Sequence, residues 1–462
     1  MAAPLLQPFV RPQEPEVNET FYDAQAAYRY VRAFFNHHGR GVNFQKVAGF
    51  GASGIVTVWE RCDENSQHKS RSFAVKIPVQ IYDPFFRAEM SWMAVTFKSY
   101  EHFVQLIELP PHNLAKGRYN NYNALDDESG AIMIMEYFEL GTLQDLLCCI
   151  NESARENRRL ELHQKKLEFI PHRILWRMFL SLTRMCIGMG YPPPADHDFN
   201  TPYREECPDC SEDGDNWEPP SRILHLDMHP QNIFLENAVS DPEHGNAPRL
   251  KLGDFGVTTE WDDEWTDEQK FESARVGRAG YQAPEQRDNR NYEPEGLGNH
   301  TNIWSAGLVM FNMLTMYYTD DPEWQPRECE VRMPHGELHP ILTWAPFLVG
   351  NLVYPEFQKY NLDLRMLIAR CMADSKDDRP VLDELVAIIQ DNIRSGDEAA
   401  ARLQAEWEEE LRNNPGSGPP SVDVTQTPEV ESDGLLRRWR REYLDEPEKR
   451  EDLYAALWDE PD

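Results

Sequence analysis

Two acids and an amide at fixed spacing are the residues of this sequence best suited to phosphate chemistry. Asp227 stands five positions before Asn232 in the segment HLDMHPQNIFL, and Asp254 follows in the segment KLGDFG. A carboxylate can orient the proton of an attacking hydroxyl, and carboxylate and amide oxygens are ligands that Mg²⁺ accepts. We therefore predict that Asp227 orients a hydroxyl nucleophile and that Asn232 and Asp254 bind magnesium.

A glycine-rich turn lies far upstream of these acids. Its pattern G-x-G-x-x-G also fits a dinucleotide-binding turn, but such a turn opens into a helix, whereas the following run IVTVW has the character of a strand. Glycines at the bend of a hairpin let backbone N–H groups approach phosphate oxygens. The sequence thus predicts a phosphate-covering lid made of Gly49, Phe50, Gly51, Ala52, Ser53 and Gly54.

A lysine downstream of the glycine turn completes the predicted phosphate site. Lys76 closes the β-type run FAVK, where it could hold the α- and β-phosphates of a nucleotide. Such a lysine needs a carboxylate to orient it. Within the helical stretch 84–100, Glu89 is the acid that suits this role, because Met90 has the wrong chemistry and Glu101 is misplaced.

The elements that must position these residues fall into two unequal halves. Short β-type runs at 44–50, 55–60 and 72–76 precede a mainly helical region that begins after Gly141. We predict an α+β fold with a small β-rich lobe, a larger α-helical lobe and a cleft between them. The predicted divisions are an N-terminal extension with a helix capped by Asn18 (1–41), the small lobe (42–138), the large lobe with an acidic insert at 192–220 (139–393), and a charged C-terminal extension (394–462).

Taken in order, these segments resemble the eukaryotic protein kinase family over about residues 42–393. Four further segments carry the resemblance: MEYF at 135–138, GYQAPE at 280–285, NIWSAG at 302–307 and DDRP at 377–380. The resemblance implies a divergent serine/threonine kinase that uses ATP and Mg²⁺ to phosphorylate a protein substrate. It also implies an ion pair between Glu285 and Arg379, a hinge with Met135 as gatekeeper, and adenine contacts from Glu136, Phe138, Val56, Ala74 and Phe234.

Four positions depart from the family pattern. Leu226 replaces an arginine that binds a phosphorylated activation loop, so we expect that activation does not depend strictly on loop phosphorylation. His229 stands in place of a lysine near the γ-phosphate, and Arg278 in place of a threonine, so that Arg278 could supply the charge that His229 carries only when protonated. Asn302 replaces an aspartate beneath the catalytic loop, and its amide oxygen can still accept backbone N–H bonds.

Two other readings of the same motifs remain. The pattern His-x-Asp-x-His-Pro-x-Asn is also similar to that of small-molecule phosphotransferases of the aminoglycoside and choline kinase type, but these generally lack the segment that ends at Glu285 and its partner Arg379. A nucleotide-binding pseudokinase scaffold is the second alternative. The presence of Lys76, Asp227 and Asp254 together favours an active enzyme.

Composition limits the partners of the chain. Its 462 residues carry a formal net charge of −33, which argues against binding nucleic acids other than ATP or anionic membranes. No apolar run approaches the roughly 20 residues that span a bilayer. The cysteines are scattered and no secretory signal is visible, so we expect a cytoplasmic or nuclear protein; the sequence indicates no oligomeric state. Cys207 and Cys210 lack a second ligand pair and fit an exposed acidic loop better than a zinc site.

The C-terminal extension has two parts. A Pro/Ser/Gly-rich and acidic stretch at 412–433 is interpreted as solvated tail. Residues 435–458 carry mixed charge together with Trp439, Tyr443, Leu453, Leu457 and Trp458. These apolar side chains leave open that this part docks onto a partner or onto the body of the protein.

Overall fold

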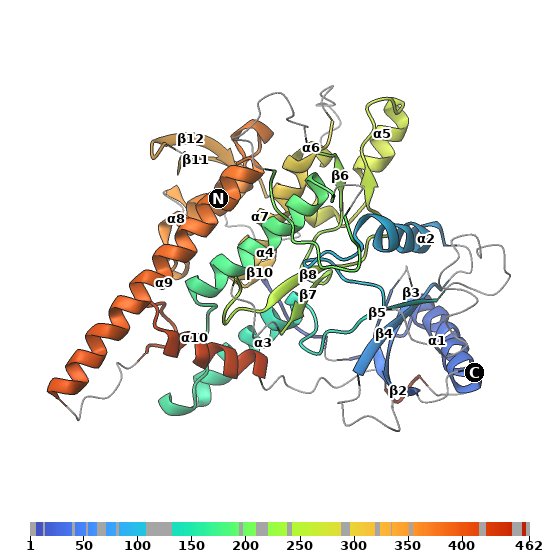
Figure 1. Ribbon diagram of the computed structural model, residues 1–462, viewed down its shortest axis with the longest axis horizontal. Helices are drawn as coiled ribbons and strands as arrows, with labels where there is room; N and C mark the ends of the chain where they lie inside the picture. Colours follow the sequence, from blue (N-terminus) through green and yellow to red (C-terminus); the bar gives the residue numbers. More distant parts are fainter. Residues whose placement is uncertain are drawn as a thin grey trace.

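The computed structural model describes residues 6–12, 14–38, 42–51, 54–61, 71–79, 83–107, 132–193, 197–208, 220–237, 243–287, 296–318, 324–333, 335–350, 354–414, 422–445 and 455–458. The predicted lid residues Ala52 and Ser53, and positions 194–196 and 209–219 of the predicted insert, lie outside this part of the chain. A small lobe built on a sheet lies beside a larger helical lobe (Figure 1). The prediction of a two-lobed α+β fold is therefore confirmed.

The small lobe is a four-stranded antiparallel sheet covered by a helix. The strands follow the order β2-β3-β4-β5 and comprise Val42–Gly51, Gly54–Arg61, Arg71–Ile77 and Met133–Glu136. Helix α1 (Glu19–His38) packs on this sheet, and Asn18 begins it as predicted, because its Oδ1 accepts the backbone N–H of Phe21 at 3.1 Å. Stacking of Phe35 on Trp59, with ring centroids 4.5 Å apart, fastens the helix to β3.

Helix α2 (Pro84–Ser91) links the small lobe to the cleft. Asp83 caps it by accepting the backbone N–H of Phe85 at 2.8 Å, and Pro84 occupies the first helical position, where no N–H is needed. A π-helical segment, Trp92–Thr96, continues from it. The helix buries Phe86 and Glu89, and the burial of a carboxylate indicates that a charged partner lies next to it.

The large lobe is mainly helical with short strand pairs. Its principal helices are α3 (Leu143–Glu156), α4 (His172–Gly190), α7 (Asn299–Thr315), α8 (Leu362–Cys371) and α9 (Leu382–Asn413). Shorter helices are α5 (Asp267–Ala274) and α6 (Pro284–Arg287). The antiparallel strand pairs are β6 (Ile223–Leu224) with β9 (Thr259–Glu260), β7 (Ile233–Glu236) with β8 (Arg249–Leu252), β11 (Arg327–Arg332) with β12 (Leu338–Thr343), and β1 (Gln7–Pro8) with β10 (Tyr317–Tyr318).

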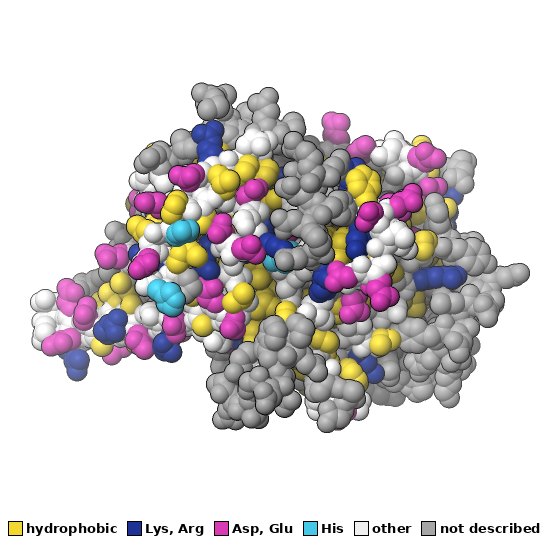
Figure 2. Space-filling model, turned by 90° about the horizontal axis from the view of Figure 1, so that it is seen from above, with side chains coloured by type: hydrophobic (Ala, Val, Ile, Leu, Met, Phe, Trp, Pro, Cys, Tyr) yellow, Lys and Arg dark blue, Asp and Glu magenta, His cyan; other side chains and the backbone are white. Residues whose placement is uncertain are grey.

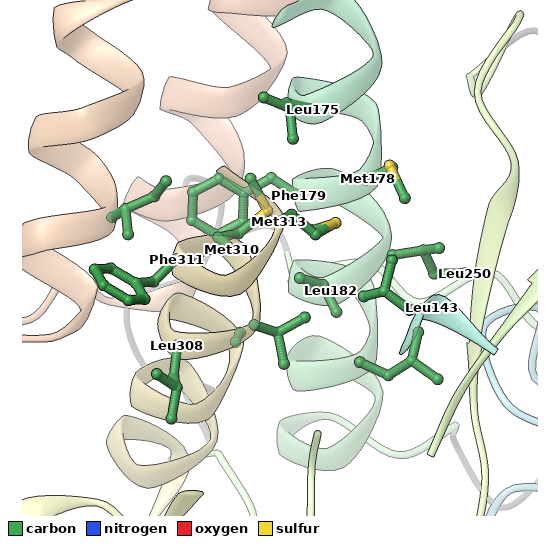
Figure 3. Packing of buried hydrophobic residues seen from close by; sticks show 14 of the residues in the cluster. Leu143, Leu175, Met178, Phe179, Leu182, Leu250, Leu308, Met310, Phe311 and Met313 are labelled. Carbon is green, nitrogen blue, oxygen red and sulfur yellow. The ribbon is translucent and has the colours of Figure 1, made fainter. Parts of the chain in front are cut away.

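The core of the large lobe lies between α4 and α7. Both helices are buried along almost their whole length, so their sequences are apolar on several faces instead of showing one stripe. Figure 3 shows Leu182 and Phe179 of α4 beside Met310 and Met313 of α7. This core supports the short strands that carry the predicted catalytic segments.

The C-terminal extension packs on the large lobe. The predicted boundary between residues 393 and 394 falls inside the continuous helix α9, which projects away from the body (Figure 1). The sequence favours a solvated tail for residues 412–433. For residues 422–433 this interpretation is wrong, because Val424 and Glu431 are buried. Glu431 accepts the backbone N–H groups of His172 and Arg173 at 2.7 and 2.9 Å and so caps α4, whose own N-cap residue, Pro171, has no polar side chain.

The segment 433–445 docks onto the large lobe, which agrees with one of the two alternatives that the sequence left open for residues 435–458. Helix α10 (Asp433–Arg440) and the π-helical turn Arg441–Asp445 bury Leu435, Trp439 and Tyr443. The tyrosine hydroxyl donates to the backbone carbonyl of Leu167. This segment is therefore part of the large lobe.

Part of the predicted acidic insert is also packed. Glu205 is fully buried, and its two oxygens accept the backbone N–H and the ring Nδ1–H of His102 at 3.0 and 2.8 Å. The residues that the structure describes contain no cluster of His, Cys, Asp and Glu able to hold a metal ion, and Cys210 lies outside them. None of the described helices has the length and apolar character needed to cross a membrane. On the face drawn in Figure 2, acidic side chains are spread over the described surface with Lys and Arg among them.

Candidate active site

A cavity of about 850 Å³ lies between the two lobes. Its size falls within the range of small-molecule and nucleotide sites. Every predicted ATP-binding residue within the described chain lines it, together with both predicted metal ligands. The predicted residues on its wall are Gly49, Phe50, Gly51, Gly54, Val56, Ala74, Lys76, Glu89, Met135, Glu136, Phe138, Asn232, Phe234 and Asp254.

The glycine turn forms the bend of the β2–β3 hairpin over this cavity. Gly51 pairs with Gly54 across the turn, and Phe50 pairs with Ile55. Gly54 has φ +147, and a Cβ there would overlap the backbone carbonyl oxygen of Ile77, so only glycine fits. A Cβ on Gly49 or Gly51 would meet nothing within 4 Å, which leaves their backbone open on the cavity side for an approaching phosphate.

Lys76 joins the two lobes through a pair of carboxylates. Its Nζ lies 2.6 Å from Glu89 Oε2 on α2 and 3.1 Å from Asp254 Oδ1 in the large lobe. Both Lys76 and Glu89 are buried, whereas the Asp254 side chain is 36% exposed to the cleft. Burial alone would lower the pKa of Lys76, but the attraction of Glu89 and Asp254 raises it, so the ammonium group stays charged.

Asp227 and Asn232 are in direct contact in the loop before β7. The Asn232 amide Nδ2 donates to the backbone oxygen and to Oδ2 of Asp227 at 2.9 and 3.1 Å. Since the amide nitrogen is used in this way, the carbonyl oxygen of Asn232 is the atom that can coordinate a cation. Gly253, next to Asp254, donates its backbone N–H to the backbone carbonyl of Asn232 at 2.9 Å, so the two predicted metal ligands are neighbours. Two oxygen donors at one wall of the cavity suit Mg²⁺.

His229 and Arg278 both contact Asp227. His229 Nδ1 accepts the backbone N–H of Gln231 at 3.2 Å, and its Nε2 lies 3.3 Å from Asp227 Oδ2. The backbone N–H of Arg278 donates to Asp227 Oδ1 at 2.9 Å. Burial alone would raise the pKa of Asp227, but the hydrogen bond and attraction of His229, with His225 and the Arg278 amide, lower it to about 2. Asp227 is thus a carboxylate at neutral pH.

The backbone at Asp254 is held in an unusual conformation by its neighbours. Asp254 has φ 62, in the left-handed region that a non-glycine residue rarely adopts. The next residue, Phe255, is fully buried with its ring 5.0 Å from that of Phe97. The ring of His225 contacts Phe255 and its Nε2–H donates to the Gly253 carbonyl at 3.1 Å. Burial of Phe255 therefore turns the carboxylate of Asp254 toward Lys76 and the cavity.

The predicted adenine contacts line the same cavity. Val56 and Ala74 belong to the sheet of the small lobe, and Phe234 belongs to β7 of the large lobe, so a flat ring between them would be held from both sides. The ring of Phe138 in the hinge lies 5.5 Å from that of Phe234.

Sequence reasoning missed a lysine that fixes the hinge. Lys251 on β8 is buried, and its Nζ donates to Glu136 Oε2 at 2.9 Å while lying 5.8 Å from the ring of Phe138. The side chain of Glu136 is thus paired with Lys251 and helps to hold the hinge in place. The available signal was the lysine at the start of KLGDFG, between Leu250 and Leu252, since a lysine buried in a strand requires a carboxylate partner.

The segment after Asp254 is anchored to the large lobe by apolar contacts. Strand β9 pairs with β6, and Leu226 packs in a cluster with Trp261, Ala274 and Leu297. Leu226 therefore occupies the position of the family's arginine as a core residue.

Two further predicted contacts are present in the large lobe. Asn302 Oδ1 accepts the backbone N–H of His225 at 3.3 Å, as predicted, and its amide donates to the Ile223 carbonyl at 2.8 Å. Arg379 pairs with Glu285 in two hydrogen bonds of 2.8 Å. The Asn302 contacts hold the segment 223–225, and the pair of Glu285 with Arg379 joins α6 to the turn before α9.

Comparison with known proteins agrees with this geometry. The family model described as "Protein kinase domain" matches residues 220–388. The chain is similar to the serine/threonine-protein kinase Nek9 of Mus musculus, at 26% identity over 45% of this chain and 17% of that protein. It is also similar to Nek5 of Mus musculus, at 28% identity over 36% of this chain and 21% of that protein.

A third relative is the putative serine/threonine-protein kinase R517/R518 of Acanthamoeba polyphaga mimivirus, at 24% identity over 42% of this chain and 34% of that protein. The chain thus spans between 17% and 34% of the length of these three relatives.

Proposed function

Because this chain is a divergent member of the protein kinase family, we propose that it is an active enzyme that transfers the γ-phosphate of ATP to serine or threonine hydroxyls of protein substrates. The observation that carries the proposal is the contact of Lys76 with both Glu89 and Asp254, at 2.6 and 3.1 Å, at the wall of the cavity. This arrangement brings together a lysine for the phosphates, a carboxylate that orients it and a carboxylate for magnesium, three of the groups that phosphoryl transfer uses.

In the proposed reaction each side chain has a limited task. Lys76, oriented by Glu89, would hold the phosphates beneath the glycine turn, and Asn232 and Asp254 would hold magnesium. Bound Mg²⁺ would neutralise charge on the phosphates. Asp227 would orient the incoming hydroxyl, since its pKa of about 2 keeps it ionised and able to accept a hydrogen bond. Catalysis would rest on positioning and electrostatics.

The ion pair of Glu285 with Arg379 supports a protein substrate over a small molecule. It joins α6, at the end of the segment that follows Asp254, to the turn before α9, and Thr301 at the start of α7 donates to the same carboxylate at 2.9 Å. This platform lies outside the nucleotide cavity and would be superfluous for phosphorylating a small molecule inside it. The names of the similar proteins support serine or threonine as the acceptor.

We propose that the reaction takes place in the cytoplasm or nucleus, because the cysteines are scattered along the chain and show no disulfide framework, which suits a reducing compartment. The alternative that remains within the family is a pseudokinase, which would bind nucleotide without transferring phosphate.

A transfer assay with radiolabelled ATP and a peptide library separates these functions. The purified chain should phosphorylate Ser/Thr peptides, and Asp227→Ala should lower kcat by at least about 100-fold while leaving MgATP binding nearly intact. Asp254→Ala should weaken MgATP binding itself. The matched control is Asp391→Ala, which removes an exposed carboxylate on α9 and should change neither quantity. Nucleotide binding by the wild type without any transfer would establish the pseudokinase alternative instead.

A further inference from the structure

The C-terminal segment 455–458 packs against α1 and the glycine turn. Trp458 is 3% exposed, and its ring centroid lies 5.1 Å from Phe21 and 5.6 Å from Tyr28, both on α1. It lies 5.5 Å from Phe50 in an edge-to-face arrangement with an interplanar angle of 86°. The backbone carbonyl of Leu457 accepts a hydrogen bond of 2.6 Å from Gln25 of α1. This segment is thus fixed between α1 and the turn.

Phe50 is the side chain through which the turn can be held. The other described residues of the turn are the glycines 49, 51 and 54, which have no side chain to pack. The ring of Phe50 contacts Phe21 of α1 at 5.8 Å as well as Trp458, so α1 and the C-terminal segment hold it together. Trp458 itself reaches the wall of the cavity. Whatever fixes Phe50 therefore fixes the backbone N–H groups of the turn.

The same C-terminal extension is anchored on the opposite lobe. Glu442 Oε2 accepts the backbone N–H of Leu167 at 2.9 Å, and Trp439 is fully buried in the large lobe. Glu442 and Tyr443 line the cavity that Trp458 also lines. One extension therefore contacts the large lobe at 433–445 and the small lobe at 455–458.

We propose that this extension is an intramolecular clamp in which Trp458 is a positioning residue that holds Phe50 and the glycine turn over the phosphates of MgATP. The proposal rests on the proposed nucleotide-binding function and adds a residue to it that lies outside the kinase motifs. Glycine-rich turns lose much conformational entropy when they close on a ligand, and a turn held in place beforehand loses less of it on binding. Trp458 would thus contribute to nucleotide affinity without touching the nucleotide's phosphates.

Calorimetric titration of the full chain with a non-hydrolysable MgATP analogue tests this role. Trp458→Ala should raise the Kd of the analogue and the KM for ATP about five- to tenfold, the range that loss of one aromatic pair supports. The KM for the peptide should stay within about twofold of the wild type, since the turn does not contact it. Trp458→Phe, which keeps an aromatic ring, should recover most of the affinity. The control Trp407→Ala removes a tryptophan from the projecting part of α9 and should leave the Kd unchanged.

A double-mutant cycle with Phe50→Ala distinguishes the clamp from a general structural role. In the Phe50→Ala background, Trp458→Ala should have little further effect on the Kd, because the contact is already lost. An equal effect of Trp458→Ala in both backgrounds would overturn the clamp and indicate loss of stability instead. A wild type that binds the analogue, together with an unchanged Kd for Trp458→Ala, overturns the clamp but leaves the proposed function intact. A wild type that binds no analogue overturns the proposed function, and the clamp with it.

Discussion

Arg379 donates two hydrogen bonds of 2.8 Å to the carboxylate of Glu285, from a position 94 residues further along the chain. The arginine is buried, and its Nη1 also donates to the backbone carbonyl of His300 at 2.9 Å. A planar guanidinium matches a carboxylate in this two-bond geometry, and a lysine does not. The pair thereby ties α6 to the first turn of α7.

Removal of either partner of this ion pair should lower the stability of the fold. Glu285→Ala leaves a buried guanidinium without its carboxylate, and Arg379→Ala leaves a half-buried carboxylate without its cation, so each should lower the free energy of unfolding by about 3–5 kcal/mol. Arg379→Lys should lie between these variants and the wild type. Urea denaturation measures the loss, and the double variant should lose less than the sum of the single ones. Simple additivity would show that the two residues act independently.

The same pair predicts how stability depends on pH. Burial alone would raise the pKa of Glu285, but the attraction and hydrogen bonds of Arg379 lower it from 4.5 to about 2. A carboxyl group with a lowered pKa in the folded state contributes stability that is fully present above its unfolded value and is lost as pH falls toward the folded value. The difference in unfolding free energy between the wild type and Glu285→Gln should therefore be constant from pH 7 to about pH 5 and shrink below pH 4.5. A difference that stays constant down to pH 3 would contradict this assignment.

The motifs of the site could be predicted because their chemistry is local in sequence. The spacing of Asp227 and Asn232 places both on one short loop, and the structure joins them by a hydrogen bond of 3.1 Å. The contact of Lys76 with Asp254 spans 178 positions, and only the resemblance to a family with a known order of motifs could bring these two together.

Contacts without such a motif could not be predicted. Glu431 caps α4 from a distance of 258 positions, and nothing in its acidic neighbourhood distinguishes it from a solvated residue. The docking of α10 had a weak signal in the sequence, because Leu435, Trp439 and Tyr443 recur every four residues and so lie on one helix face. For Trp458 the surface that it contacts could not be predicted, and its place beside Phe50 follows only from the tertiary structure.

The packing of Leu226 predicts that the segment after Asp254 is held by apolar burial instead of by a phosphate. Leu226 has φ 63 and is 7% exposed among Trp261, Ala274 and Leu297. Leu226→Ala should destabilise this cluster by about 2 kcal/mol or more and lower kinase activity. Faster hydrogen exchange at positions 257–276 would report the loosening. Leu342→Ala, at a leucine 48% exposed on β12, is the matched control and should change neither readout.

Removing the hydroxyls of the same segment should leave catalysis largely intact. Thr258 is buried, and Thr266 serves as the N-cap of α5 by accepting the backbone N–H of Gln269 at 3.3 Å, so both already have structural roles. The variant in which Thr258, Thr259, Thr266 and Ser273 are replaced by alanine should keep kcat within about threefold of the wild type, with a small loss from the missing cap. Loss of all transfer in a variant with a normal melting transition would show that loop phosphorylation is required after all.

Arg278 holds a guanidinium on the loop that carries Asp227 and Asn232. Its backbone N–H donates to Asp227, and its guanidinium Nη2 donates to Gln231 Oε1 at 2.8 Å, so the side chain lies along this loop. At position 229 of the same loop, protein kinases have a lysine where this chain has a histidine. Arg278→Gln keeps the backbone contact and removes the charge. We expect it to lower kcat about 10- to 100-fold with little change in the KM for ATP, because charge that builds on the transferring phosphate loses a stabilising partner.

Steady-state kinetics against ATP at fixed peptide concentration separate this role from simple binding. Arg275→Gln removes a neighbouring exposed guanidinium that lies 4.0 Å from the ring of Phe271, and it serves as the matched control with kcat unchanged. Arg278→Lys should retain part of the rate, since it restores a charge without the fixed fork of the guanidinium. If Arg278→Gln and Arg275→Gln have equal effects on kcat, the charge at position 278 takes no special part in phosphate transfer.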